Sequence, residues 1–480
     1  MAIGTTIKTI QDIMRKDTGV DGDAQRIGQL VWMLFLKILD DREREKAETI
    51  DKYQSPIPGP FRWRAWAGDA EGMTGDTLLG FVNNDLFPGL KNLPGTDPLS
   101  GVVRSVFEDA YNYMKNGTLL RQVINKLNEI DLNRKSDRHE IGGIYEQLLS
   151  DLRGAGNAGE YYTPRAVTEF LVERVDPQLD ETVLDPACGT GGFLTCTIEH
   201  KRKKYRKKAA DEKKIQASIR GIEKKPLPHL LCMTNMLLHQ LDAPTQIEHK
   251  NALGRAVSDY RKSDLVDVIL TNPPFGGIEE DGIENAFPAA FRTRETADLF
   301  LYLLTVLLKD GGRAALVLPD GTLFGEGVKT RLKERLLKEC DLHTIVRLPK
   351  GVFAPYTSIK TNLLFFTKGR PTKEIWFYEH PYPAGVKSYS KTKPMRIEEF
   401  EPERAWWNDR KETDQAWRVT LEDVVGRNYN LDIKNPRAAD DGPGDADTLL
   451  EQYRILQGEV AEVRNKLRDE LRAALEGAGR

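Results

Sequence analysis

The chain has 480 residues, of which 40% are hydrophobic and 30% charged, and its formal net charge is −3. This length exceeds what one compact core usually supports, so we expect two or three domains. The near-neutral charge argues against a self-sufficient nucleic-acid binder and leaves room only for a local basic patch or for help from a partner.

The apolar and cysteine patterns argue against two further classes of protein. The longest apolar run, 299–308, is half a membrane span, and residues 1–15 lack the apolar segment of a signal peptide. The four cysteines show no CxxC pairing and no metal-like spacing, and the seven histidines form no metal or triad pair. We therefore expect a soluble protein of the cytoplasm without disulfides or a bound metal.

Residues 1–155 are predicted to form a helical N-terminal domain. Apolar residues at helical spacing occur in 27–39, 119–132 and 142–152, and no catalytic pattern accompanies them. Structural or interaction roles are therefore expected here. After a small-residue linker at 154–159, Thr163 is predicted to cap a helix over 165–174, with Pro164 at its first position.

Residues 156–370 alternate short apolar strands with helices. The expected strands are 182–184, 218–222, 266–270, 313–318, 342–347 and 361–367, and the expected helices are 192–206, 228–240, 298–309 and 327–339. This alternation predicts an α/β domain with a doubly wound parallel sheet. Such sheets bind ligands outside the carboxyl ends of their strands.

The remainder of the chain is predicted to form two parts. Residues 371–445 are a mixed, proline-rich extension, and 446–480 contain a long amphipathic helix with heptad-like apolar spacing. This helix packs on its own domain or docks on a partner, and the pattern favours neither.

The first chemical motif is a glycine turn after the first strand. Asp185 ends that strand, glycines within 189–192 follow, and Glu223 ends the second strand. A dinucleotide site would want a third glycine where Leu194 stands, and a phosphate loop would want a Gly-Lys-Ser/Thr sequence that is absent. Two carboxylates beside a glycine turn suit a ligand with an ammonium group and a ribose, as in S-adenosylmethionine.

The second motif is Asn272-Pro273-Pro274-Phe275, directly after the apolar strand 266–270. Neither proline can donate to a sheet, and both hold the backbone rigid, so the segment forms a ledge at a strand end. The ledge presents an amide, backbone carbonyls and an aromatic ring, which are the groups needed to hold a planar amino group. A plain strand exit is the alternative interpretation.

These motifs, in this order, resemble the N6-adenine amino-methyltransferases of DNA. The resemblance assigns cofactor binding to an N-terminal motif, to the glycine turn and to the ribose-binding acid, and catalysis to the Asn-Pro-Pro-Phe ledge. The implied cofactor residues are Glu160, Tyr161, Tyr162, Thr163, Pro164, Arg165, Asp185, Gly189, Thr190, Gly191, Gly192, Glu223 and Asn251. Asn251 departs from the aspartate of many relatives, but its amide oxygen still accepts a hydrogen bond.

Over essentially its whole length the chain resembles the modification (M) subunit of type I restriction-modification systems. This resemblance implies a pair of M subunits that assemble with a specificity (S) subunit and optionally with a restriction (R) subunit. The helical N-terminal domain would then act as an interaction domain or DNA clamp, and the C-terminal helix would dock on a partner.

The implied mechanism needs no metal and no strong base. The side-chain oxygen of Asn272 and the carbonyl of Pro273 would accept the two N–H bonds of the adenine amino group, and Phe275 would stack on the flipped base. Phe275→Ala is expected to lower turnover while cofactor affinity survives.

Sequence recognition is expected to reside in another chain. Only about 75 residues separate the catalytic region from the C-terminal helix, too few for a recognition domain of the size that self-contained relatives carry. The basic tract 201–208 either contacts phosphates or is a solvated helix end, and the second interpretation is slightly favoured.

Two alternatives remain open. A methyltransferase for another planar amino group, such as guanine N2 in ribosomal RNA or a glutamine amide in a protein, would share the ledge. A catalytically silent assembly subunit would share the fold, although the intact acids, glycines and Asn272 argue against it.

Overall fold

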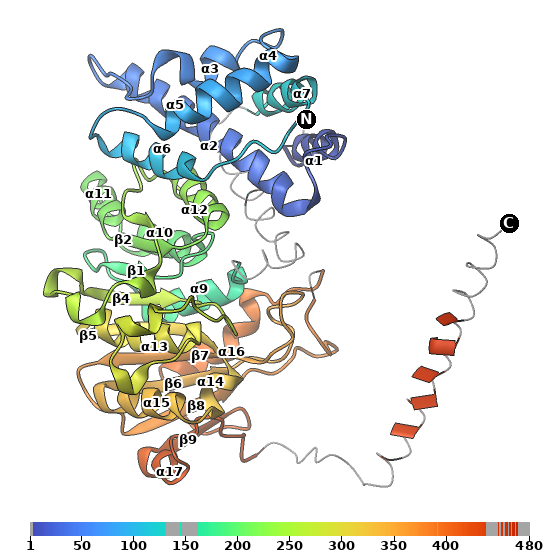
Figure 1. The fold of residues 1–480 in the computed structure, drawn as a ribbon. Coiled ribbons are helices and arrows are strands. Elements are labelled where there is room, and N and C mark those ends of the chain that lie inside the picture. The colour runs from blue at the N-terminus through green and yellow to red at the C-terminus, as the bar shows by residue number, and fades with distance from the viewer. Residues whose placement is uncertain are drawn as a thin grey trace. The chain divides into compact units, whose positions relative to one another are not determined.

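The computed structural model describes residues 3–130, 145, 162–390 and 392–437, together with 450, 453–454, 457–458, 460–461, 463–465 and 467–468. Residues Met1–Ile433 form one compact unit, and Lys434–Arg480 form a second (Figure 1). The described residues between 450 and 468 are helical, as the C-terminal pattern predicts. The predicted helix 142–152 lies outside the described residues except for Tyr145, and so does the linker 154–159.

The N-terminal part is helical, as predicted. Its long central helix is predominantly apolar over 27–39, with Gln29 and Lys37 as polar exceptions, and is buried on every side there, which is the pattern of a helix inside a core. Trp32 of this helix meets Phe87 edge-on, with ring centroids 5.0 Å apart. The helices are α1 (Ile3–Met14), α2 (Gly22–Thr49), α3 (Trp63–Trp66), α4 (Gly75–Gly80), the π-helical η2 (Phe81–Leu86), α5 (Phe87–Lys91), α6 (Pro98–Glu108) and α7 (Gly117–Asn128).

A nine-stranded sheet follows, in the order β3-β2-β1-β4-β5-β7-β6-β8-β9. The strands β1 to β4 and β5 run parallel, but β7 runs antiparallel between β5 and β6, and β9 is antiparallel to β8. The fold class is confirmed, whereas the expectation of an all-parallel sheet is wrong at β7 and β9. The strands are β1 (Val183–Asp185), β2 (Ile219–Glu223), β3 (Ile247–His249), β4 (Val266–Thr271), β5 (Leu308–Pro319), β6 (Cys340–Arg347), β7 (Thr361–Lys368), β8 (Glu374–Glu379) and β9 (Ala416–Thr420).

Both faces of the sheet are apolar and covered. Along β5, Leu316 and Leu318 belong to one buried cluster, and Ala315 and Val317 belong to the cluster on the other face, as side chains alternate along a strand. The helices of this region are α9 (Arg165–Val175), α10 (Gly192–Lys204), α11 (Ala209–Ala217), α12 (Pro226–Leu238), α13 (Thr296–Leu307), α14 (Asp320–Phe324), α15 (Val328–Glu339), α16 (Glu401–Trp407) and α17 (Leu421–Gly426). Short 3₁₀ turns are η1 (Gly59–Phe61), η5 (Ala252–Gly254), η6 (Val257–Asp259), η7 (Lys262–Asp264), η8 (Ile283–Ala286), η9 (Ala289–Phe291) and η10 (Ile397–Phe400).

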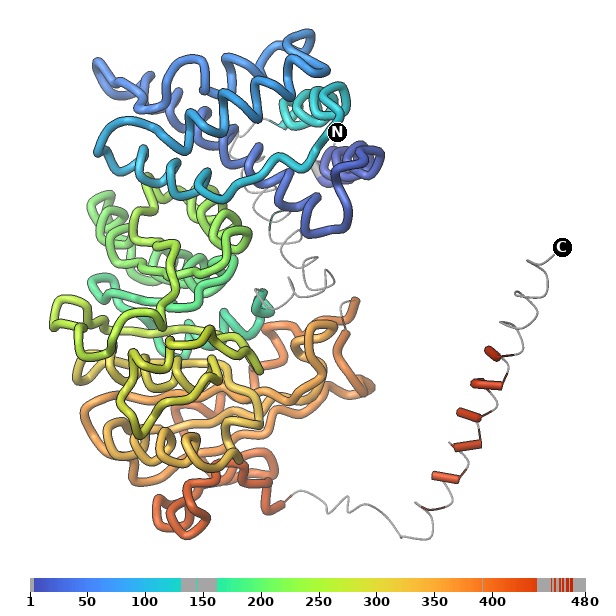
Figure 2. The backbone as a smooth tube through the Cα atoms, in the orientation of Figure 1, coloured from blue at the N-terminus to red at the C-terminus, as the bar shows by residue number. Residues whose placement is uncertain are grey.

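The helix α12 joins the N-terminal helices to the sheet. One buried cluster includes apolar residues of α1, α2, α6 and α7 together with those of α12. The guanidinium of Arg42 in α2 donates to the carbonyl of Leu241, just after α12, at 2.5 Å, and the hydroxyl of Tyr145 donates to the carbonyl of Leu231 at 2.8 Å. Figure 2 shows the N-terminal helices lying against the segment that contains α12. No helix of the described ranges is long and apolar enough to cross a bilayer.

Candidate active site

Four predicted site residues lie in a row along one edge of the sheet. The strands β4, β1, β2 and β3 are neighbours and parallel, so their carboxyl ends share this edge. Asn272, Asp185, Glu223 and Asn251 stand at or just after these ends, in that order across the sheet. A cavity of about 210 Å³ runs along the row and is lined by Thr163, Asp185, Pro186, Ala187, Cys188, Gly189, Thr190, Gly192, Phe193, Glu223, Lys224, Lys225, Lys250, Asn251, Ala252, Asn272, Pro274, Gly277, Ile278, Glu279, Thr296 and Phe300.

The glycine turn forms the floor of this cavity between β1 and α10. Gly191 caps α10 with a φ of 83°, and a Cβ there would lie 2.9 Å from the sulfur of Cys232, so both conformation and space require glycine. The carbonyl of Thr190 accepts a hydrogen bond from Asn235 of α12 at 3.1 Å. Gly191 packs against Cys232 of α12 and does not line the cavity, whereas Gly189, Thr190 and Gly192 do.

Asp185 is a carboxylate with neutral partners. Its Oδ1 accepts from the hydroxyl of Thr271 at 2.7 Å and from the backbone N–H of Ala187 at 3.1 Å. Its residue exposure is 1%, and burial raises its pKa to about 7. Since no Lys or Arg of the described residues pairs with it, a cationic group in the cavity would stabilise its ionised form.

Glu223 ties β2 to the glycine turn. Its Oε2 accepts from the backbone N–H of Gly189 at 2.9 Å, and its Oε1 accepts from that of Lys225 at 2.7 Å. Burial raises the pKa of this carboxyl as well. Each oxygen keeps a further lone pair, so the carboxylate can still accept from hydroxyl groups of a ligand.

The ledge after β4 contains an amide with one half hydrogen-bonded and the other half without a described partner. The Nδ2 of Asn272 donates to the hydroxyl of Thr163 at 3.0 Å, whereas Oδ1 is buried and has no hydrogen-bond partner among the described residues. Pro274 lines the cavity beside it. Phe275 meets Phe353 edge-on, with centroids 6.0 Å apart, so the ledge and the segment after β6 each contribute one ring.

The N-terminal motif is only partly brought to the cavity. Glu160 and Tyr161 lie outside the described residues. Thr163 lines the cavity, but it does not cap α9, because the N-cap is Pro164 and no side chain caps the helix. The prediction of a Thr163 cap is therefore wrong, and its hydroxyl instead accepts from Asn272.

Other predicted site residues lie apart from the cavity. Arg165 pairs with Glu169 at 2.8 Å and with Glu199, so its guanidinium joins α9 to α10. Tyr162 packs against the buried cluster that contains α12. The set that does not line the cavity is Tyr162, Pro164, Arg165, Gly191, Pro273 and Phe275.

Sequence reasoning missed the contribution of the segment 276–296. Glu279 and Thr296 come from this segment and line the cavity, and Phe300 of α13 does so as well. No local pattern marks them, because an acid in a stretch of exposed acids resembles a solvated loop.

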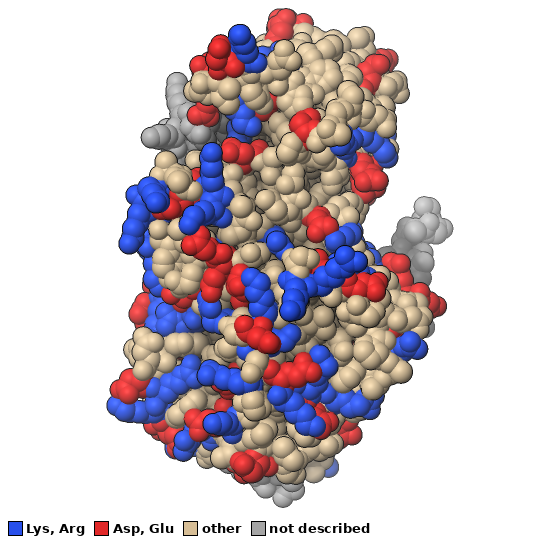
Figure 3. All heavy atoms as spheres, turned by 90° about the vertical axis from the view of Figure 1, so that its left-hand side faces the viewer, with Lys and Arg blue, Asp and Glu red and all other residues tan. Residues whose placement is uncertain are grey.

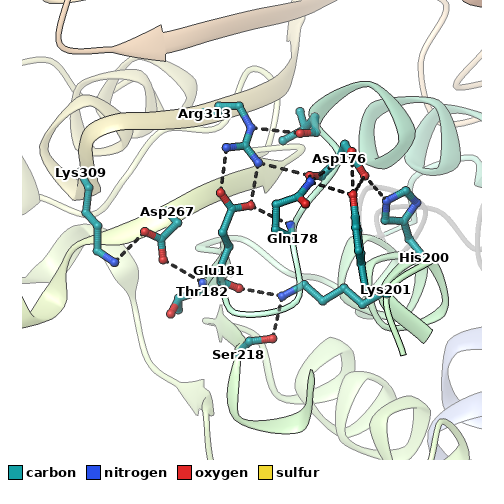
Figure 4. Close-up of polar contacts among 12 residues, drawn as sticks. Asp176, Gln178, Glu181, Thr182, His200, Lys201, Ser218, Asp267, Lys309 and Arg313 are labelled. Atoms are coloured by element: carbon teal, nitrogen blue, oxygen red, sulfur yellow. Dashed lines mark hydrogen bonds and ion pairs between the residues drawn. The ribbon is translucent and has the colours of Figure 1, made fainter. Parts of the chain in front are cut away.

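The basic tract 201–208 lies at the opposite edge of the sheet, and four of its seven basic side chains are engaged within the protein. The buried Nζ of Lys201 donates to the carbonyl of Glu181 at 2.7 Å and to Ser218 at 2.8 Å, and burial lowers its pKa to about 8 (Figure 4). Arg202 pairs with Glu212. Figure 3, which views the side on which α11 is labelled in Figure 1, shows Lys and Arg interspersed with Asp and Glu.

Two family models match the chain: N-6 DNA Methylase over residues 136–442 and HsdM N-terminal domain over residues 3–127. The methylase subunit of the type I restriction enzyme EcoEI from Escherichia coli is 61% identical over 487 aligned positions, which cover 99% of each chain.

Solved structures agree with these matches. The crystal structure of a modification subunit of a putative type I restriction enzyme from Vibrio vulnificus superimposes with a TM-score of 0.81 at 44% identity, over 91% of this chain and 97% of that one. A chain from a structural study of assembly and conformational transition in the type I R-M system has a TM-score of 0.81 at 37% identity, over 97% of this chain and 98% of that one. The chain therefore belongs to the N-6 DNA methylase family, as the methylase subunit of a type I restriction-modification system.

Proposed function

We propose that this chain transfers a methyl group from S-adenosylmethionine to N6 of an adenine turned out of a DNA duplex, with Asn272 as the residue that holds the adenine amino group. The observation that carries the proposal is the buried Oδ1 of Asn272, which has no donor among the described residues. A buried acceptor without a partner is costly to the fold, and an adenine amino group supplies the missing donor.

The orientation of the amide supports this role. An asparagine side chain could turn either its oxygen or its nitrogen toward a ligand. In the structure Nδ2 donates to the hydroxyl of Thr163, which leaves the oxygen as the half of the amide without a described partner. Thr163 is in this proposal a positioning residue for Asn272.

The ledge offers a second acceptor and a stacking surface. Pro273 is buried and does not line the cavity, but no described donor reaches its carbonyl, which would accept the second N–H of the amino group. Two acceptors on one amino group favour a pyramidal nitrogen whose lone pair points away from both. Phe275, braced by Phe353, would stack on the flipped base.

The cavity fits S-adenosylmethionine, which supplies an electrophilic methyl group when bound. Asp185 is a buried carboxylate without a described cation, and it would pair with the ammonium group. Glu223 would accept from the ribose hydroxyls, and Gly189, Thr190 and Gly192 would let the backbone approach the ligand closely. These side chains hold and orient the reactants, so positioning rather than acid–base chemistry lowers the barrier.

The chain would act within a larger assembly. We propose that it pairs with a second copy of itself and with a specificity subunit that chooses the adenine, and optionally with a restriction subunit. Support comes from the near-neutral net charge, because a chain that reads DNA unaided is usually more basic.

The test uses the complete complex from cells that carry the chain with its neighbouring genes. N6-methyladenine in the DNA and binding of S-adenosylhomocysteine by calorimetry are measured for wild type, Asn272→Ala and Asn285→Ala. Asn285 is exposed and lies outside the cavity, so it is the matched control. We expect Asn272→Ala to lower methylation by about 10²–10³-fold, a loss comparable to that of one preorganised hydrogen bond, while ligand binding survives.

Two outcomes would contradict the proposal. Full methylation by Asn272→Ala would remove this residue from the chemistry. Absence of both ligand binding and methylation in the wild type would instead indicate a silent assembly subunit.

A further inference from the structure

One acidic side chain enters the cavity from outside the row of strand ends. Glu279 belongs to the segment that leaves the ledge after β4 and returns to α13, and it is 8% exposed. Its backbone N–H donates to the carbonyl of Arg294 at 2.8 Å, and the N–H of Thr296 donates to the carbonyl of Gly277 at 3.0 Å. These bonds close the base of the loop and fix Glu279 in place.

The carboxylate of Glu279 lies over the β2–β3 end of the cavity. Its Oε2 accepts from Lys224, after β2, at 3.1 Å and from the Nδ2 of Asn251, after β3, at 3.1 Å. Its Oε1 accepts from the hydroxyl of Thr296 at 3.2 Å. A carboxylate accepts about four hydrogen bonds, so capacity for a ligand remains.

Asn251 does not turn its oxygen toward a ligand. The Oδ1 of Asn251 accepts from the backbone N–H of Leu253 at 2.9 Å and caps the turn that follows. Its amide nitrogen is directed to Glu279. The acceptor offered at this end of the cavity is therefore the carboxylate of Glu279, and not the amide oxygen of Asn251 that the sequence led us to expect.

The walls at this end suit a flat ring. Ala252, Ile278 and Phe300 line the cavity with apolar side chains, and Lys224, Lys225 and Lys250 line the same end. In the order of the strands this end lies beyond Glu223, the proposed ribose acid, and farthest from Asn272. Apolar side chains combined with a few placed polar groups are typical of a site for a heteroaromatic ring with an exocyclic amino group.

We propose that Glu279 accepts a hydrogen bond from the exocyclic amino group of the cofactor's adenine and thereby selects an adenine-containing cofactor over its 6-oxo analogue. The inference rests on the proposed function, because it takes S-adenosylmethionine as the ligand. Lys224 offsets the charge of the carboxylate at this end of the cavity.

The test compares the affinities of the full-length protein for S-adenosylhomocysteine and S-inosylhomocysteine by calorimetry. The second ligand presents a carbonyl oxygen where the first has an amino group, and two acceptors facing each other repel. We expect wild type to favour S-adenosylhomocysteine by at least tenfold. Glu279→Ala should bring the ratio of the two affinities to within about threefold of one.

The neighbouring acid supplies the control. Glu280 also pairs with Lys224, at 3.0 Å, but its side chain is 76% exposed and does not line the cavity. Glu280→Ala should keep the wild-type ratio. The double variant Asn251→Asp/Glu279→Ala returns a carboxylate to the same wall and should restore discrimination.

The outcomes separate a failure of the role of Glu279 from a failure of the proposed function. Equal affinities in wild type would overturn the role of Glu279 even if Glu279→Ala fails to fold. A ratio preserved in folded Glu279→Ala would overturn it as well. If wild type binds neither ligand, the proposed function fails together with this inference.

Discussion

The two edges of the parallel part of the sheet use their polar side chains in opposite ways. At the carboxyl edge, Asp185 has only neutral partners and the oxygen of Asn272 has none among the described residues. At the amino edge, Arg313 makes two bonds to the carboxylate of Glu181, at 2.9 and 2.7 Å, and Lys309 pairs with Asp267 at 2.7 Å (Figure 4). At the amino edge the protein itself supplies the charged partners, whereas at the carboxyl edge Asp185 and Asn272 keep groups without such partners among the described residues.

The pKa values of the acids report the same contrast. Burial without a cation raises the pKa of Asp185 to about 7. At the amino edge burial acts in the same direction, but hydrogen bonds from Lys204, Tyr205 and His200 hold the pKa of Asp176 well below its usual value. Burial alone therefore does not separate the two acids; the hydrogen bonds that Asp176 receives from Lys204, Tyr205 and His200 do.

The largest effect is expected from removing an ion pair at the amino edge, which should lower the stability of the protein. Arg313→Met removes both bonds to Glu181 and one to the carbonyl of Val175 at 3.0 Å. We expect the free energy of unfolding to fall by about 1–3 kcal/mol, because the pair is only partly buried, with S-adenosylhomocysteine affinity unchanged in the folded protein. Denaturant unfolding and calorimetry measure the two quantities. Lys203→Ala, an exposed neighbour in the basic tract, is the control.

A smaller effect is expected at Thr163, where the sequence predicted cofactor contact and the structure shows a bond to Asn272. Thr163→Val should lower kcat about tenfold, the cost of about 1.4 kcal/mol in positioning, with little change in S-adenosylhomocysteine affinity. Thr163→Ser keeps the hydroxyl and should retain activity. A loss of affinity equal to the loss of kcat would instead favour direct contact with the cofactor.

The pH dependence of ligand binding sharpens the comparison at Asp185. Its folded pKa, about 7, lies above the ordinary 3.8, so its contribution to the stability of the unliganded protein is lost as pH rises through 7. A ligand ammonium favours the ionised carboxylate, so S-adenosylhomocysteine affinity should increase about tenfold from pH 6 to pH 8. Calorimetry at pH 6 in two buffers of different ionisation enthalpy should show proton release. Asp185→Asn should abolish that release, and an unchanged release would exclude Asp185 as its source.

The smallest effect is expected in the basic tract. Lys203 and Lys207 are exposed there, at the edge away from the cavity. The double variant Lys203→Glu/Lys207→Glu should leave the salt dependence of DNA binding by the complex unchanged. A flatter salt dependence would show that DNA reaches the amino edge.

The strand-end residues could be predicted because their signals are local. Asp185, Glu223 and Asn272 each follow an apolar run directly, and parallel strands bring their carboxyl ends together. The partner of Thr163 could not be predicted in this way, because the Asn272 amide lies 109 residues away and outcompetes the local helix cap. Glu279 was missed for the same reason, since only the folded loop brings it to Asn251.

The strands that the sequence did not predict are either very short or lie in a proline-rich part of the chain. β3 has three residues, too few for a periodic pattern. β8 and β9 lie in the proline-rich region after 370, yet they join the sheet and continue it beyond the predicted catalytic boundary. The direction of β7 depends on pairing between β5 and β6, which no local pattern encodes.

The helix α12 links the stability of the glycine turn to the packing of the N-terminal helices. One side of this helix is buried with the N-terminal helices, and its Asn235 and Cys232 support the glycine turn from below. A chain shortened to 162–433 would expose apolar side chains of α12 to water and would loosen the support under Thr190. The N-terminal helices therefore stabilise the helix that packs under the cavity, although none of the described residues of α1–α7 lines the cavity.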